Sequence, residues 1–196
     1  MRVIMFRLMS LCTVFLFLLP GEYANGQNNP VANPAAVVVV GDARFTILTP
    51  CLIRMEWSAQ AQFEDHASLV FINRRLPVPK FETKDAGDWR VITTDHLQVR
   101  YKRGSGKFSA GNLEVRFVLN GRDIVWKPGL DDTANLGGTT RTLDGAKGAI
   151  PLEPGLLSRN GWVVVDDSQR PLFDESDWPW VMPRPQTERQ DLYFLG

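Results

Sequence analysis

The chain has 196 residues, of which 22 are basic and 22 acidic, so its formal net charge is zero. The basic residues are dispersed along the chain. This argues against nucleic acid or an anionic membrane as a partner, because such partners are bound by clustered Lys and Arg. The length fits one domain of ordinary size with a sizeable hydrophobic core.

The amino terminus predicts a signal peptide. Arg2 and Arg7 precede an apolar run over residues 8–19, and Gly26 provides a small residue at a plausible cleavage site. A basic start, a short apolar run and a polar exit are typical of secretory leaders. A transmembrane helix is the alternative, but a span needs about 20 apolar residues and this run is shorter. We therefore expect residues 1–26 to be removed on export to the periplasm or the extracellular space.

The mature chain is expected to form one β-domain over residues 37–196, after a flexible Asn- and Pro-rich start over residues 27–36. Apolar and polar residues alternate in several stretches, and a period of two places every second side chain on one face of a strand. Half-buried strands are thus predicted, with Arg54 and Glu56 on the solvent side of theirs. The stretches are residues 53–57, 97–102 and 113–119.

Two further stretches, residues 68–72 and 162–165, are uniformly apolar and predict strands buried on both sides. The pair Asn120–Gly121 predicts a tight hairpin, because both residues tolerate a positive φ. Short strands with regular turn signals and no amphipathic helix indicate an antiparallel β-sandwich. Residues 131–157 and 174–190 lack this pattern, so we expect them to form long loops of the kind that often carries function.

The search for chemistry gives few candidates. His66 and His96 are thirty residues apart, and Cys51 is the only cysteine after the leader, so no metal site is predicted. The sequence has no nucleophile elbow and no phosphate-binding glycine loop. We therefore expect no catalytic residue and no cofactor in this chain.

Asp166 and Asp167 remain as candidate substrate-binding residues, because carboxylates accept hydrogen bonds from sugar hydroxyls and aromatic faces stack on sugar rings. Trp162, Trp178 and Trp180 lie near them in sequence. The alternative is that Trp162 belongs to the core and that the two aspartates are turn residues after a strand. Adjacent aspartates usually point to opposite sides of an extended chain, so they make a poor catalytic pair.

Four ordered segments of the chain resemble the N-terminal domain of glycoside hydrolase family 31. Arg44–Ser58 resembles its opening hairpin, and the last segment resembles the stretch that leads into the catalytic barrel. The remaining segments are Leu136–Gly145, Gly155–Trp162 with Asp166–Ser168, and Asp191–Gly196.

This resemblance implies a β-sandwich of the galactose mutarotase-like kind that packs against a (β/α)8 barrel. Family members are retaining α-glucosidases and α-xylosidases, and both catalytic aspartates belong to the barrel, so the chain alone is expected to be inactive. The barrel expected after Gly196 is missing from this sequence, which suggests a truncated part of such an enzyme. The loop Arg159–Ser168 is our candidate for a segment that shapes the substrate pocket.

Two functional hypotheses follow from the sequence. In the first, the chain is the accessory sandwich of a secreted α-glycosidase, with the family 31 barrel and an α-linked oligosaccharide as its partners. In the second, it is a free-standing carbohydrate-binding or interaction module that uses Trp178 and Trp180. Neither hypothesis involves nucleic acid, or a membrane once the leader has been removed.

Overall fold

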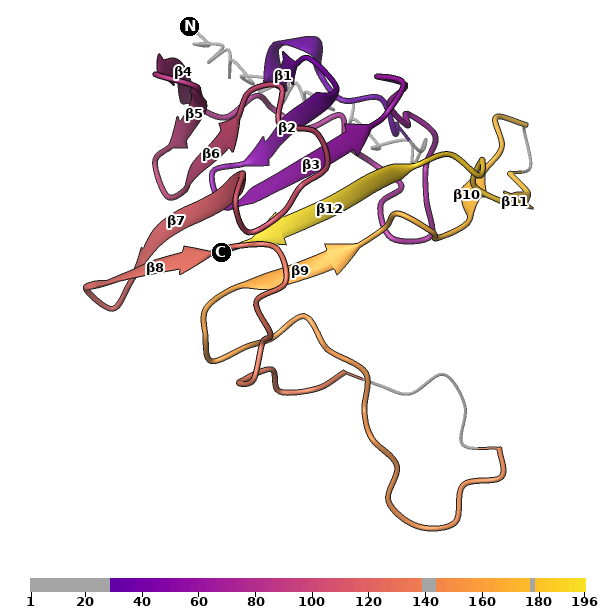
Figure 1. Cartoon of the computed structure of the whole chain (residues 1–196). Coiled ribbons are helices and arrows are strands. Elements are labelled where there is room, and N and C mark those ends of the chain that lie inside the picture. Colours follow the sequence, from indigo (N-terminus) through magenta and orange to yellow (C-terminus); the bar gives the residue numbers. More distant parts are fainter. Residues whose placement is uncertain (1–28, 139–143, 177–178) are drawn as a thin grey trace, which may run out of the picture.

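The computed structural model describes residues 29–138, 144–176 and 179–196, so the predicted signal peptide lies outside the described residues. Within these ranges the chain forms twelve strands and one short 3-10 helix, and the paired strands are antiparallel (Figure 1). The all-β prediction is confirmed. Across the same ranges, no helix has the length and apolar character needed to cross a bilayer.

The first sheet has five strands in the order β1-β2-β3-β12-β9. Its last strand in the chain, β12, lies between β3 and β9, so the two ends of the domain meet in one sheet. The predicted opening hairpin is present as β2 and β3. The bounds are β1 Val37–Val40, β2 Ala43–Thr49, β3 Leu52–Ser58, β9 Val163–Asp166 and β12 Arg189–Leu195.

The 3-10 helix Pro34–Ala36 precedes β1 and is capped by Asn33, whose side chain accepts a hydrogen bond from the Ala35 N–H. Further upstream, the Asn29 carbonyl accepts hydrogen bonds from the N–H groups of Arg74 and Arg75. The described part of the segment expected to be flexible therefore makes contacts with the body of the domain.

The second sheet is a meander of five strands in chain order, and it confirms the predictions for residues 97–102 and 113–119. Asn120 and Gly121 have φ values of 51° and 76°, as a tight hairpin between β7 and β8 requires. A small pair, β10 and β11, lies apart. The bounds are β4 Phe81–Ala86, β5 Trp89–Thr94, β6 Gln98–Lys102, β7 Leu113–Leu119, β8 Arg122–Trp126, β10 Leu172–Phe173 and β11 Val181–Met182.

Aromatic rings join the two sheets across a shared core. Phe45 of β2 lies 5.6 Å from Tyr101 of β6, and Phe194 of β12 lies 6.1 Å from Phe117 and 5.3 Å from Trp126, measured between ring centroids. All five side chains are buried. Contacts of this kind add to the stabilisation from burial. The architecture is therefore sandwich-like, with one hydrophobic core between two antiparallel sheets.

Three predictions about the positions of strands and loops are wrong. Residues 68–72 form no strand: Ser68 makes only an isolated bridge, and Leu69 and Ile72 are exposed. Residues 163–166 do form β9, but this is an edge strand whose Val164 and Val165 are only half-buried. The loop expected over residues 174–190 contains β11 and the start of β12.

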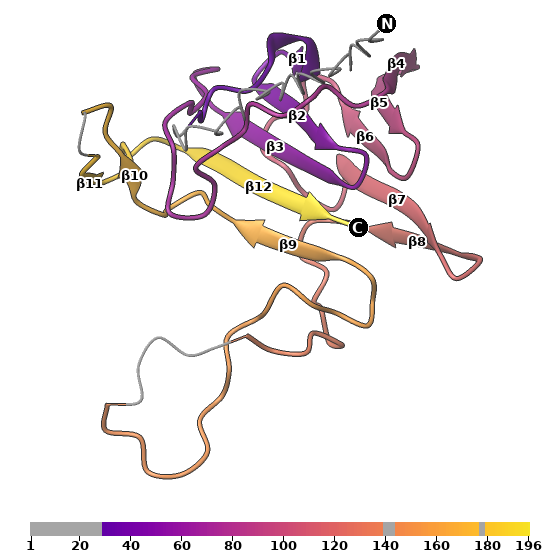
Figure 2. The same ribbon diagram turned by 180° about the vertical axis from the view of Figure 1, so that it is seen from behind.

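A long connection, residues 127–162, joins β8 to β9, and we call it the arm; the middle of its described part extends away from both sheets (Figures 1 and 2). Its described residues form no strand, which confirms the predicted long loop. Two parts of the arm run side by side, since the Gly138 N–H donates to the Glu153 carbonyl. A Cβ atom on Gly155 would lie 2.4 Å from the Gly137 carbonyl oxygen, so this approach requires glycine.

Candidate functional site

Charged residues occupy the outer face of the first sheet, opposite the core. The alternation in β2, β3 and β12 points Arg44, Arg54, Glu56 and Asp191 to this face. Arg54 and Glu56 were predicted to face solvent, and this is wrong, because both are at most 3% exposed. The face is covered by residues 62–76 and by the described residues of the segment 167–188, which contact it through the Glu64 carbonyl and the Arg184 side chain.

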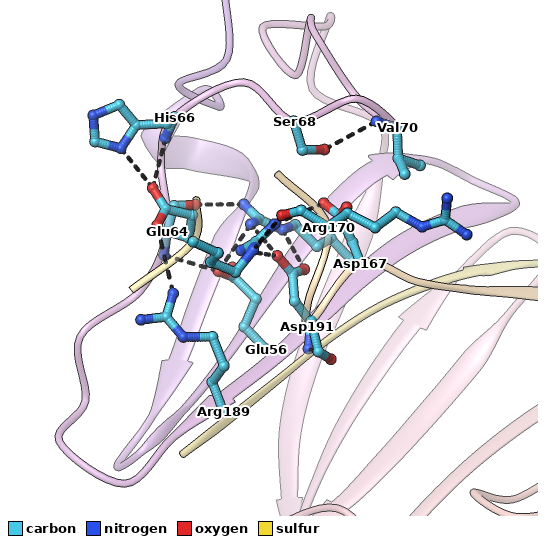
Figure 3. Close-up of polar contacts among 12 residues, drawn as sticks. Glu56, Glu64, His66, Ser68, Val70, Asp167, Arg170, Arg189 and Asp191 are labelled. Carbon is cyan, nitrogen blue, oxygen red and sulfur yellow. Dashed lines mark hydrogen bonds and ion pairs between the residues drawn. The ribbon is translucent and has the colours of Figure 1, made fainter. Parts of the chain in front are cut away.

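These residues and the covering segments form one buried charge cluster (Figure 3). Arg54 donates two hydrogen bonds to the Asp191 carboxylate, at 2.8 and 2.7 Å. Arg184 contacts Asp191 and Asp167, each at 3.1 Å. The cluster comprises Arg44, Arg54, Glu56, Glu64, Arg74, Asp167, Arg184, Arg189 and Asp191.

Burial and neighbouring charges have opposite effects on the carboxylates of this cluster. Burial raises the pKa of Asp191, but the nearby guanidinium groups of Arg54, Arg184 and Arg74 together lower it by more, so the net pKa is below its ordinary value. Burial also raises the pKa of Glu56, and there the effect of burial prevails over the lowering effect of Arg54. The carboxylates of Asp191 and Glu56 are thus paired with arginines and are not free to act on a ligand.

The cluster leaves no room for a ligand. The hollow lined by Glu56, Glu64, Arg184 and Asp191 has a volume of about 10 Å³. A single water molecule needs about that much space. We therefore assign the cluster a structural role, in which it holds the covering segments against the first sheet.

The structure separates the two predicted substrate-binding residues. Asp167 has no exposed surface; its backbone N–H donates to the Asp191 carbonyl, and its carboxylate belongs to the buried charge cluster. Burial raises the pKa of Asp167 above its ordinary value. Asp166, the last residue of β9, is exposed, and its Oδ1 accepts a hydrogen bond from the Ser168 N–H at 2.9 Å. Only Asp166 is open to a ligand.

Asp166 lies on a groove beside the free edge of β9, which we call the edge groove. Its volume is about 740 Å³, within the usual range for small-molecule sites. Trp126, Trp162 and Leu192 provide apolar surface, while Asp166 and Arg170 provide polar groups. The Arg170 Nε donates to the Asp166 carbonyl at 3.1 Å. The groove thus combines an apolar surface with a carboxylate, which is the chemistry expected of a sugar site.

The tryptophans take different positions. Trp162 is buried and lies 6.3 Å from Trp126 between ring centroids, so the interpretation of Trp162 as a core residue is confirmed. Trp178 lies outside the described residues. Trp180 is 67% exposed, and its backbone N–H donates to the Asp174 carboxylate. Trp180 is therefore available for stacking on a ligand.

No protein-family model matches the chain, and no curated protein matches it either. In the part of the chain that the structure describes, no group of three or more His, Cys, Asp and Glu residues could hold a metal ion.

Proposed function

We propose that the chain is the N-terminal accessory domain of a secreted retaining α-glycosidase of glycoside hydrolase family 31. In this role it packs on the catalytic (β/α)8 barrel and helps to shape the carbohydrate pocket. The four ordered sequence segments that resemble this family support the proposal. The finer description as a galactose mutarotase-like sandwich is part of it.

The observation that carries the docking role is the apolar surface of the arm. Five leucines of the arm are between 51% and 69% exposed, although leucine is a residue that folding normally buries. They are Leu130, Leu136, Leu152, Leu156 and Leu157. Exposed apolar side chains gathered on one segment mark an interaction surface. A barrel packed against the arm would bury them.

Asp166 is the residue that we propose to contact the substrate. Its carboxylate is exposed at the edge groove, and it can accept a hydrogen bond from a sugar hydroxyl. Asp167, the other residue predicted at this site, would act indirectly. Through Arg184 it holds the chain that follows Asp166 in place.

The docking role can be tested by binding of the mature chain to a family 31 barrel that lacks its own sandwich domain. We expect a one-to-one complex in analytical ultracentrifugation. The double variant Leu156→Asp, Leu157→Asp should abolish the complex, because burying two charges at the interface is costly. Val39→Asp is the matched control, since Val39 is 56% exposed but lies on β1, at the edge of the first sheet opposite β9 and the arm. A folded barrel that does not bind the chain would contradict the proposal.

The alternative, a free-standing carbohydrate-binding module, is favoured by one observation, the exposed indole of Trp180. A module of this kind would bind α-linked oligosaccharides without a barrel, and Trp180→Ala would remove the stacking contact. Isothermal titration of the mature chain with maltooligosaccharides distinguishes the two functions. Binding that depends on Trp180 and needs no barrel would support the alternative.

A further inference from the structure

A second hollow, which Trp162 also lines, lies between the β7–β8 hairpin and the two ends of the arm. Its volume is about 640 Å³, and Arg122 and Arg159 are among its lining residues, so we call it the arginine pocket. The other lining residues are Leu119, Asn120, Ile124, Leu130, Asp131, Thr133, Asn160 and Trp162.

The walls of the arginine pocket are held by contacts within the domain. Gly161 packs so closely on Leu119 that a Cβ atom at this glycine would lie 2.5 Å from the leucine side chain. This contact brings the arm onto the β7–β8 hairpin. The Asp132 carboxylate accepts hydrogen bonds from Ser158 at 2.6 Å and from Asn160 at 2.7 Å, which joins the two ends of the arm. The pocket is therefore built before any ligand arrives.

Two guanidinium groups in this pocket lack a partner among the residues that the structure describes. The side chains of Arg122 and Arg159 form no hydrogen bond or ion pair with any described residue. Most other arginines of the domain, Arg44, Arg54 and Arg184 among them, are bound to carboxylates. Arginine is suited to bidentate recognition of a carboxylate, because its planar donor groups match the two oxygens.

We infer that the arginine pocket binds a uronic acid residue, that is, a sugar ring carrying a carboxylate. Arg122 and Arg159 would bind the carboxylate, while Asn120, Asn160 and Asp131 provide donors and acceptors for ring hydroxyls. A volume of about 640 Å³ lies within the range of small-molecule sites and exceeds what a bare inorganic anion needs.

The position of the pocket suggests how a longer saccharide would lie. The arginine pocket and the edge groove share Leu130, Asp131 and Trp162 in their linings, so they are adjacent. A saccharide with its uronic acid in the pocket could extend a neutral residue toward Asp166. The pocket itself requires no barrel, and this inference stands apart from the docking role of the arm.

The test is an NMR titration of the isotope-labelled mature chain with sodium glucuronate, with glucose and with sodium sulfate. We expect saturable shifts at the pocket residues with glucuronate and much weaker ones with the other two. Arg122→Gln and Arg159→Gln should each weaken glucuronate binding by about tenfold or more, because each removes charge-assisted hydrogen bonds. Arg75→Gln is the matched control, as Arg75 is exposed and lies outside the pocket.

Each other outcome would overturn the inference. Equal binding of glucose and glucuronate would show that the arginines do not select a carboxylate. Equal binding of sulfate would show an anion site without recognition of a sugar. The pocket does not bind a uronic acid if the wild type shows no saturable shift. The same follows if folded Arg122→Gln and Arg159→Gln proteins keep the glucuronate affinity of the wild type.

Discussion

Replacing Asp191 by asparagine removes the negative charge at the centre of the buried charge cluster and nearly preserves the side-chain shape. The carboxylate accepts two hydrogen bonds from Arg54 and one from Arg184, and all three side chains are at most 4% exposed. Loss of one partner of a buried ion pair costs about 3–5 kcal/mol, because the other charge is left uncompensated. For a domain of this size that corresponds to a fall of roughly 6–20 °C in Tm.

Urea denaturation of the wild type and Asp191→Asn, followed by circular dichroism, measures this loss as a change in midpoint at constant slope. Asp85→Asn is the matched control. Asp85 pairs with Arg90 at 2.7 Å and Arg103 at 3.1 Å, but its side chain is 42% exposed. Exposed pairs contribute about 0–1 kcal/mol. If Asp191→Asn unfolds within about 1 kcal/mol of the wild type, the cluster does not hold the covering segments as we describe.

The remaining predictions concern acid, a glycine, the two candidate aspartates and activity. The pKa of Asp191 is below its ordinary value of about 4, so the ionised carboxylate contributes its full stabilisation above that pH. This stabilisation is lost as the pH falls through the pKa of the folded protein. The difference in free energy of unfolding between wild type and Asp191→Asn should therefore narrow between about pH 5 and pH 2. Gly161→Ala should lower the free energy of unfolding by about 1–2 kcal/mol in urea denaturation, because φ is +75° there, whereas Gly111→Ala should have little effect. In an enzyme made by joining a family 31 barrel to the chain, Asp166→Ala should lower kcat/KM by about tenfold to hundredfold at unchanged Tm. If Asp166 is only a turn residue, the substitution should instead lower Tm and leave kcat/KM unchanged. Asp167→Ala should instead lower stability by about 1–3 kcal/mol, because it leaves a buried guanidinium with fewer partners. The mature chain alone should not hydrolyse p-nitrophenyl α-glucoside, and turnover that survives removal of contaminating enzymes would refute this.

The features that the sequence predicted well depend on local pattern. The alternation over residues 97–102 and 113–119 identifies β6 and β7, because a strand with one buried face repeats every two residues. The turn at Asn120–Gly121 was equally clear, since few residue pairs adopt positive φ twice in succession. Both signals are complete within a few residues of sequence.

Burial of the polar face of the first sheet could not be predicted from the same pattern. Alternation in β3 shows that Arg54 and Glu56 share a face, but it does not show what covers that face. The cover consists of segments distant in sequence, and the partners of Arg54 include Asp191, 137 residues away. The prediction of a strand over residues 68–72 was wrong for a related reason, because this apolar run belongs to one of these covering segments.

The candidate site was predicted only in part. The sequence pointed to Asp166 and to the loop that begins at Arg159, and it correctly expected the two adjacent aspartates to point to opposite sides. It gave no sign that Asp167 is the buried one. Arg122 also had no sequence signal, because the fold brings the β7–β8 hairpin and the arm together across a long separation.

The central claim is that this domain completes a family 31 α-glycosidase. The most direct test compares the hydrolysis of p-nitrophenyl α-glucoside and α-xyloside by a family 31 barrel alone and by the same barrel joined after Gly196. We expect the joined enzyme to have the higher kcat/KM with at least one substrate, because the proposed packing of the domain would stabilise the barrel and shape its pocket. Equal kcat/KM values for the two proteins, both folded by circular dichroism, would contradict the claim.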